Sequence, residues 1–176
     1  MVFGREQASG LRWVGMGGRL ELPRGITGFD LDTAPFDDTL FRRFGAVSHA
    51  IARIGRGRIG TLEDCAGQVT PNFHLAELHR PSGTAYLLCN AHYPWVAATL
   101  RRPGWMGVPF VDLPEVVTAA TMFSDFVFPV ALDLNRQPEP DELARLTGGE
   151  LHQYRYWRKG RADEARLGDV IFNFWD

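Results

Sequence analysis

The sequence has few cysteines and none of the common spacings of metal ligands. Its 176 residues include only Cys65 and Cys89, too few for the disulfide framework of a small secreted domain. Neither Cys-x-x-Cys nor His-Glu-x-x-His, the spacings typical of zinc sites, occurs in the chain. The Gly-x-Ser-x-Gly motif of serine hydrolases is also missing. We therefore expect no metal site, no cofactor and no hydrolase of that kind.

Lysine is scarce as well. Of the 19 basic residues, 18 are arginine and only Lys159 is lysine, a bias that indicates a bacterial source. No lysine follows a glycine-rich loop as in a P-loop. The stretch GRGRIG at 55–60 has the spacing of a dinucleotide-binding loop, but it follows a predicted helix, whereas that loop needs a strand before it. With a net charge of −2, the sequence predicts neither nucleotide nor nucleic-acid binding.

Long apolar runs are absent too. No window approaches the roughly 18 consecutive apolar residues of a membrane span, and the first residues show no signal-peptide pattern. Both observations predict a cytoplasmic protein without a membrane partner. The hydrophobic content of 45% is enough for one sizeable core, so we expect a single domain over residues 1–176.

Two regular patterns are clear. Over residues 37–54, apolar residues recur at spacings of four and three, with an aspartate to cap the start and Gly55 to end the helix. Over residues 72–92, two alternating runs flank Pro81–Gly83, which predicts a β-hairpin with a three-residue loop.

Most of the other segments have the pattern of short strands. Helices are predicted over 114–123 and 139–146. The predicted strands are 19–22, 26–31, 94–100, 108–113, 125–134 and 151–159, and residues 168–176 fit either a strand or a helical turn. Because strands outnumber helices and follow one another through tight turns, we expect an α+β fold. It would be mainly an antiparallel sheet with two or three helices packed on it.

The predicted hairpin carries three of the chain's five histidines. A three-residue loop pairs His74 with Asn90 and Asn72 with His92, so that all four side chains share one face. Such a cluster can relay a proton, or bind a metal if a carboxylate joins it. The candidates for that carboxylate are Asp64 and Asp125. The simpler interpretation is that these side chains are half-exposed at the end of the sheet and bond each other and water.

Acidic charge is concentrated in the second half of the chain, and aromatic residues cluster in four segments along the whole chain. Residues 1–110 carry a net +3 and residues 111–176 a net −5. The aromatic segments are 93–95, 104–110, 154–157 and 171–175. Trp, Tyr and Arg commonly anchor protein interfaces, although aromatic side chains of a small domain also fill its core.

Our leading hypothesis is a small binding or inhibitory protein, such as an immunity-type protein, with another protein as its partner. It would use an aromatic and acidic surface of the second half. Acidic groups would help to block the basic cleft of a nucleic-acid-cleaving enzyme. The candidate binding residues are Tyr154, Arg155, Trp157, Arg158, Tyr93 and Trp95.

The alternative hypothesis is a small cofactor-free enzyme, an isomerase, cyclase or hydrolase acting on a small molecule or peptide. His74 or His92 would be the general base, and Asn90 would orient it or donate to an oxyanion. Tyr93 and Trp95 would wall the pocket. The enzyme requires both imidazoles in one concave pocket, whereas a binding protein leaves them on a rim.

Overall fold

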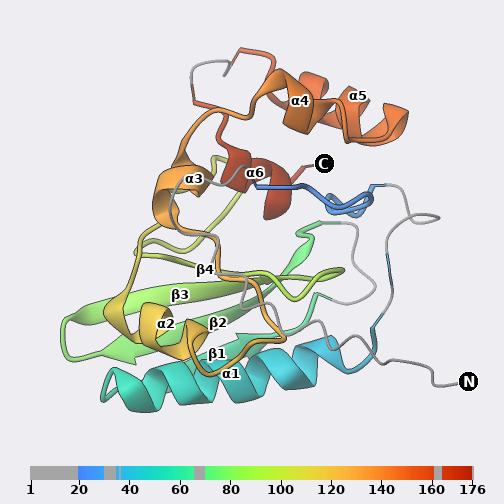
Figure 1. The fold of residues 1–176 in the computed structure, drawn as a ribbon. Coiled ribbons are helices and arrows are strands. Elements are labelled where there is room, and N and C mark those ends of the chain that lie inside the picture. The colour runs from blue at the N-terminus through green and yellow to red at the C-terminus, as the bar shows by residue number, and fades with distance from the viewer. Residues whose placement is uncertain (1–19, 30–34, 36, 66–69, 161–163, 176) are drawn as a thin grey trace, which may run out of the picture.

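The computed structural model describes residues 20–29, 35, 37–65, 70–160 and 164–175. They form a four-stranded antiparallel sheet in the order β1-β2-β3-β4, with helices on both faces (Figure 1). The strands are β1 (Arg58–Glu63), β2 (Phe73–Arg80), β3 (Gly83–Asn90) and β4 (Val96–Thr99). The helices are α1 (Leu40–Ile54), α2 (Pro114–Ala120), α3 (Ala131–Asn135), α4 (Pro140–Leu143), α5 (Gly148–Trp157) and α6 (Leu167–Ile171). The predicted antiparallel α+β fold is confirmed, with more helices in these residues than the two or three expected.

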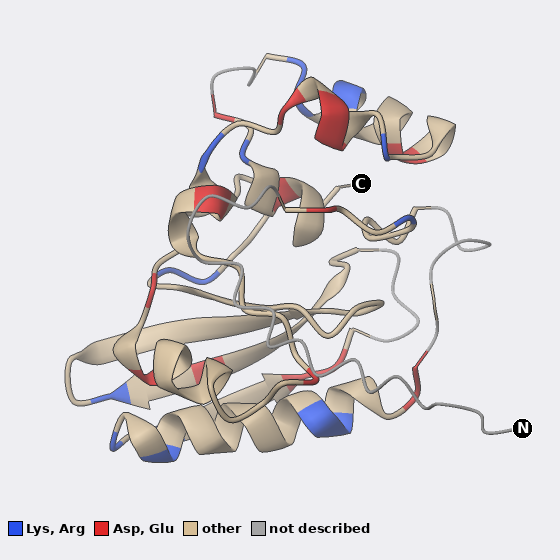
Figure 2. Ribbon diagram, viewed as in Figure 1, with Lys and Arg blue, Asp and Glu red and all other residues tan. Residues whose placement is uncertain are grey.

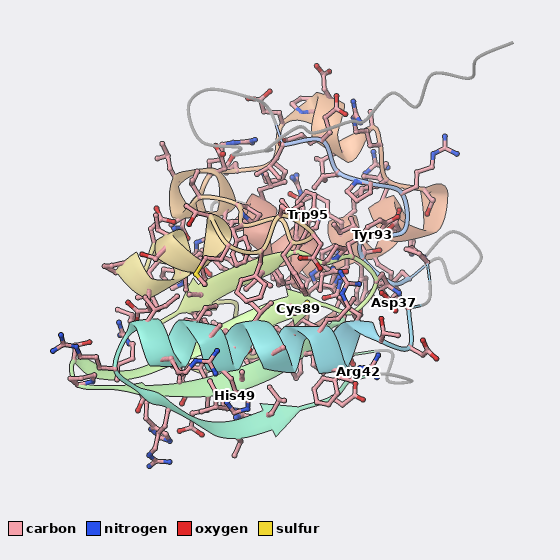
Figure 3. All side chains as sticks on the ribbon, turned by 60° about the horizontal axis from the view of Figure 1, so that its bottom comes forward. Asp37, Arg42, His49, Cys89, Tyr93 and Trp95 are labelled. Atoms are coloured by element: carbon pink, nitrogen blue, oxygen red, sulfur yellow. The ribbon has the colours of Figure 1, made fainter. Side chains whose placement is uncertain are left out.

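One face of the sheet is covered by α1 and α2 (Figure 1). The apolar stripe of α1 points inward, and Phe44 and Ile51 are fully buried against β2 and β3. Arg42 and His49 lie on the outer side of the helix (Figure 3). The Gly55 N–H donates to the Ile51 carbonyl at 3.0 Å and ends the helix. The helix predicted over 37–54 is thus confirmed apart from its first three residues.

The opposite face is covered by segments from both parts of the chain. Residues 20–29, drawn in blue, lie beside the red α6 and the C-terminal segment (Figure 1). The core on this face contains Leu22, Ile26, Tyr154 and Trp175, all 2% exposed or less. This side of the molecule therefore depends on contacts between distant parts of the sequence.

The β2–β3 hairpin is confirmed, but its predicted register is wrong by one residue. Arg80 pairs with Gly83, so the loop has two residues, Pro81 and Ser82, rather than three. The prediction placed Gly83 inside the loop because glycine suits a left-handed position. Gly83 does have a positive φ of 118°, but it takes this conformation as the first residue of β3. A shift of one residue moves each side chain of one strand to the other face of the sheet relative to its partner.

Several other predicted strands are wrong. Residues 108–113 make only an isolated bridge from Phe110 to Thr99, and residues 125–134 make one from Val127 to Trp95 before α3 begins. Residues 151–159 belong largely to α5. This helix begins at Thr147, whose hydroxyl accepts a hydrogen bond from the Glu150 N–H while the Glu150 carboxylate accepts one from the Thr147 N–H. The local capping box thus overrides an alternating pattern of side chains.

The remaining elements follow the predictions in part. Strand β4 and helices α2 and α4 lie within the predicted 94–100, 114–123 and 139–146, and the last segment forms a helical turn, α6. Strand β1 was not predicted. Residues 19 and 30–31 of the predicted N-terminal strands lie outside the described residues, and the described parts are turns and irregular backbone. No helix of the described residues is long and apolar enough to cross a bilayer.

Candidate functional site

The observed register separates the predicted histidine–asparagine cluster. His74 pairs with Cys89, and its ring packs against Phe41 and Phe44 on the α1 side of the sheet. Asn90 pairs instead with Phe73, on the opposite face. The prediction that His74 and Asn90 share a face is therefore wrong, because it depended on the three-residue loop.

His74 lies in a buried site near the start of β2. Its side chain is 3% exposed, and its Nδ1 lies 3.0 Å from the Asp64 Oδ1 and 3.3 Å from the backbone N of Cys65. Nδ1 accepts from the Cys65 N–H when it is unprotonated and donates to Asp64 when it is protonated, but it cannot do both at once. Burial lowers the pKa of His74, against the opposing effect of the Asp64 carboxylate. The neutral ring, bonded to Cys65, is therefore the form that the buried site favours.

Cys65 does not form a nucleophilic pair with this histidine. Its Sγ lies 3.6 Å from the His74 Nδ1. Burial, together with the neighbouring Asp64 charge, raises the pKa of the Cys65 thiol to about 12. Because the thiolate is the reactive form, Cys65 is a protonated core side chain at neutral pH.

The two predicted metal carboxylates have different positions. Asp64 lies beside His74, as described above, whereas the Asp125 carboxylate lies 2.9 Å from the Arg43 guanidinium, which also pairs with Asp37. In the described part of the chain, no group of three or more His, Cys, Asp or Glu side chains is arranged to hold a metal ion.

Asn90 belongs to a buried network of amides that holds the backbone together. Its Nδ2 donates to the carbonyls of Ile26, at 2.8 Å, and Ile171, at 2.6 Å. Its Oδ1 accepts from the N–H groups of His92 and Tyr93. Both amide hydrogens and both acceptor positions are thus used. No amide hydrogen is left for a developing oxyanion, so the catalytic role suggested for Asn90 would require these bonds to break.

The same network continues through two more asparagines. The Asn72 Nδ2 donates to the carbonyls of Ile26 and Ile171 as well, and its Oδ1 accepts from the Asn173 N–H at 2.7 Å. The Asn173 Nδ2 donates to the Thr27 carbonyl. Asn72, Asn90 and Asn173 are each 2% exposed or less. These side chains join the ends of the hairpin strands to residues 26–27 and to the C-terminal segment.

His92 lies just beyond the end of β3. Its Nδ1 donates to the Pro35 carbonyl at 3.2 Å, and its Nε2 lies so close to Gly28 that a Cβ there would be 2.7 Å away. Gly28 has a φ of 75°, so this loop requires glycine both for its conformation and for its contact with the ring. Neither His92 nor His74 is among the residues that line the pocket beside α2, the pocket between α4 and α5 or the pocket beside Glu63 and Arg102.

The six predicted binding residues have very different environments. Tyr154 and Trp95 are 2% and 8% exposed and belong to the core. Tyr93 is partly buried, and its hydroxyl donates to the Arg24 carbonyl at 2.6 Å; Figure 3 shows Tyr93 and Trp95 within the body of the molecule. Trp157 is half-buried against Trp175. The remaining two, Arg155 and Arg158, are exposed.

A short turn that was not chosen as a site exposes two large apolar side chains. Gly104, Trp105, Met106 and Gly107 form a β-turn, here called the Trp105 turn, closed by a 3.0 Å bond from the Gly107 N–H to the Gly104 carbonyl. Trp105 is 58% exposed and Met106 55%. The Trp-Met pair is flanked by Gly104 and Gly107, and this pattern in the sequence could have indicated an exposed turn.

Two contacts hold the Trp105 turn on the protein. The Trp157 Nε1 donates to the Trp105 carbonyl at 3.4 Å. Gly107 has a φ of 66°, and a Cβ there would lie 2.6 Å from the Asp169 Oδ1 of α6. Glycine thus allows the turn to lie directly on the Asp169 carboxylate. The turn is fixed at both α5 and α6, while its two apolar side chains point to solvent.

The acidic charge of the second half lies partly inside the protein. Of the carboxylates that the structure describes in this half, four are buried, and each is bonded to a polar partner. The buried carboxylates are Glu115, Glu142, Glu150 and Asp169. Their partners include Arg80, Arg136, Thr27 and the Arg166 N–H. Helix α4 carries only acidic charges, but α5 carries both signs (Figure 2), so the net −5 of this half does not translate into a uniformly acidic surface.

Comparisons of the chain with protein-family models, with curated proteins and with solved structures found no match.

Proposed function

We propose that the chain is a binding or inhibitory protein that contacts another protein through the Trp105 turn. The observation that supports this proposal most directly is the exposure of Trp105 and Met106 on a turn held by contacts with α5 and α6. Exposed Trp side chains on a fixed backbone have the properties of interface hot spots. Both side chains belong to one of the aromatic segments that the sequence directed us to.

The fixed backbone matters because binding costs conformational entropy. A flexible loop must be ordered when its partner binds, whereas a turn already held by Trp157 and Asp169 loses less freedom. The partner side would then be an apolar pocket that accepts the Trp105 ring. Half-buried Trp157, which lies under the turn, extends the contact surface toward α5.

Photo-cross-linking followed by an affinity measurement tests the proposal. A photoreactive amino acid at position 106 would capture the partner in cells of the source organism, and the partner would then be purified. We expect Trp105→Ala to weaken binding to that purified partner by about 30-fold or more, as is usual for a hot-spot residue. Isothermal titration calorimetry would measure the dissociation constants.

Met122→Ala is the matched control for Met106→Ala. Met122 follows α2 and is 62% exposed, close to the 55% of Met106, but α2 covers the α1 side of the sheet. We expect Met106→Ala to weaken binding several-fold and Met122→Ala to change it less than about twofold. Equal effects of the two variants, or an unchanged affinity of Trp105→Ala, would show that the Trp105 turn is not the interface.

A further inference from the structure

Between helices α4 and α5 lies an open pocket that the binding proposal does not use. The pocket has a volume of about 410 Å³. Its α4 side is lined by Leu143 and Ala144, and its α5 side by Leu151, Tyr154, Arg155 and Arg158. Each helix begins with a capping box, formed by Glu139 with Glu142 and by Thr147 with Glu150. These bonds fix where the two helices start, and so they fix the walls of the pocket.

The lining of the pocket is amphipathic. Leu143, Leu151 and the Tyr154 ring supply apolar surface, and Arg155 and Arg158 supply two guanidinium groups. The Arg158 guanidinium carbon lies 5.7 Å from the centre of the Tyr154 ring, within the range of a cation–π contact. Tyr154 is itself buried against Trp175, with ring centres 6.0 Å apart. The position of Arg158 is thus supported from the core outward.

These two arginines differ from the other described arginines in the second half of the chain. Arg136, Arg145 and Arg166 each lie within 4 Å of a carboxylate oxygen, of Glu142, Glu21 and Asp169 respectively. Over the residues that the structure describes, neither Arg155 nor Arg158 forms such an ion pair. Among the described arginines of the second half, the two that make no ion pair with a carboxylate are therefore the two that line this pocket.

We propose that this pocket binds a small organic anion that has an oxyanion head and an apolar body. The head would accept hydrogen bonds from the Arg155 and Arg158 guanidiniums, which present planar pairs of donors suited to carboxylate or phosphate oxygens. The apolar body would cover Leu143 and Leu151 and remove their surface from water. Binding thus requires both parts of the ligand.

Calorimetric titrations of the full-length protein with four probes test this requirement. The probes are decanoate, decyl phosphate, 1-decanol and inorganic phosphate, each below the concentration at which it aggregates. We expect decanoate or decyl phosphate to bind at least about tenfold more tightly than decanol or inorganic phosphate, because each of the last two lacks one part of the ligand. The tighter of the two anions identifies a carboxylate or a phosphate as the preferred head.

Substitutions locate the binding in this pocket. Arg155→Gln and Arg158→Gln should each weaken binding of the preferred anion about tenfold, because each removes a charge-assisted hydrogen bond. Arg145→Gln is the matched control, since Arg145 is an exposed arginine just after α4 that does not line the pocket. Ala144→Phe places a ring in the pocket and should abolish binding. Circular dichroism would verify that each variant keeps the wild-type fold.

Three results would overturn the proposal. The first is no binding of either amphipathic anion up to about 5 mM, the range of weak small-ligand affinity. The second is binding of decanol or inorganic phosphate as tight as that of the amphipathic anions. The third is equal binding by Arg145→Gln, Arg155→Gln and Arg158→Gln.

Discussion

The two faces of the sheet are held by different means. On the α1 side, regular helices place apolar side chains such as Phe44 and Ile51 against the strands. On the other side, short helices and irregular segments pack around buried polar groups, among them Asn90 and Asn173. Both faces bury a core, but only the second needs an extensive network of hydrogen bonds between segments distant in sequence.

This difference follows from the backbone. A helix of 15 residues such as α1 satisfies most of its own N–H and C=O groups, so its contact with the sheet can be almost entirely apolar. Irregular segments such as residues 20–29 cannot do so, and their buried carbonyls need donors from elsewhere. Asn72 and Asn90 supply donors to the same two carbonyls. The amide network is therefore a structural requirement of the irregular face.

The largest effect that we predict is the loss of the central amide. Asn90→Ala leaves the His92 and Tyr93 N–H groups without an acceptor and removes one of the two side-chain donors to the Ile26 and Ile171 carbonyls. We expect the free energy of unfolding to fall by about 3 to 5 kcal/mol, since each unsatisfied buried group costs about 1–3 kcal/mol. Urea denaturation followed by circular dichroism would measure this loss.

Ser48→Ala supplies the comparison on the α1 side. Ser48 is fully buried in α1, and its hydroxyl has no hydrogen-bond partner among the described residues. Removing it eliminates an unsatisfied group and improves helix propensity, so we expect a change of about 0.5 kcal/mol or less, in the stabilising direction. If Asn90→Ala cost no more than Ser48→Ala, the two faces would not differ in the way argued here.

The same contrast explains which parts of the fold could be predicted from the sequence. Helix α1 and the β2–β3 hairpin were predictable because their patterns are local and repeat over several turns or residue pairs. Helix α5 was mistaken for a strand because its side chains alternate, although Thr147 and Glu150 have the spacing of a capping box. The Thr27–Glu150 bond joins residues 123 positions apart, and no local pattern could indicate it.

The candidate sites were predictable to a smaller extent. The sequence directed attention to the aromatic segments, but it could not separate buried Tyr154 from exposed Trp105, because burial depends on which segments meet in space. The predicted cluster of His74 and Asn90 was wrong for a single reason. Its geometry depended on whether Gly83 belongs to the loop or to the strand, a difference of one residue that reverses the relation between the two faces.

The next largest predicted effect concerns the buried Asp169 carboxylate on the irregular face. Burial raises the pKa of Asp169 to about 6, although its bond to the Arg166 N–H and the Arg166 charge act in the opposite direction. The folded state therefore binds the proton more tightly than the unfolded state, and this stabilisation is lost as the pH rises from about 4 to above 6. About two pKa units correspond to roughly 3 kcal/mol at most.

Asp169→Asn isolates this contribution because an amide does not titrate over this range. We expect the variant to gain in unfolding free energy relative to the wild-type protein between pH 4 and 7, by up to roughly 3 kcal/mol, with no further change above pH 7. His74 titrates in both proteins, so its effect cancels in the difference. Urea denaturation at several pH values would measure the gain, and a difference independent of pH would contradict the assignment. The Asp169 carboxyl resonance in NMR spectra should titrate near pH 6.

The last prediction compares how α1 and α5 begin. The Thr147 hydroxyl accepts from the Glu150 N–H at 3.3 Å, whereas the Thr39 hydroxyl before α1 makes no capping bond and donates to Asp37. Thr147→Ala should lower the free energy of unfolding by about 1 kcal/mol, and Thr39→Ala by less, because only the first variant removes a helix cap.

Hydrogen exchange provides a second, local test of the same cap. Thr147→Ala should speed the exchange of the first amides of α5 while those of α1 stay unchanged, because the long amphipathic α1 is held by its packing on the sheet. Equal losses in the two variants would mean that α5, too, is held by its packing and does not depend on its cap.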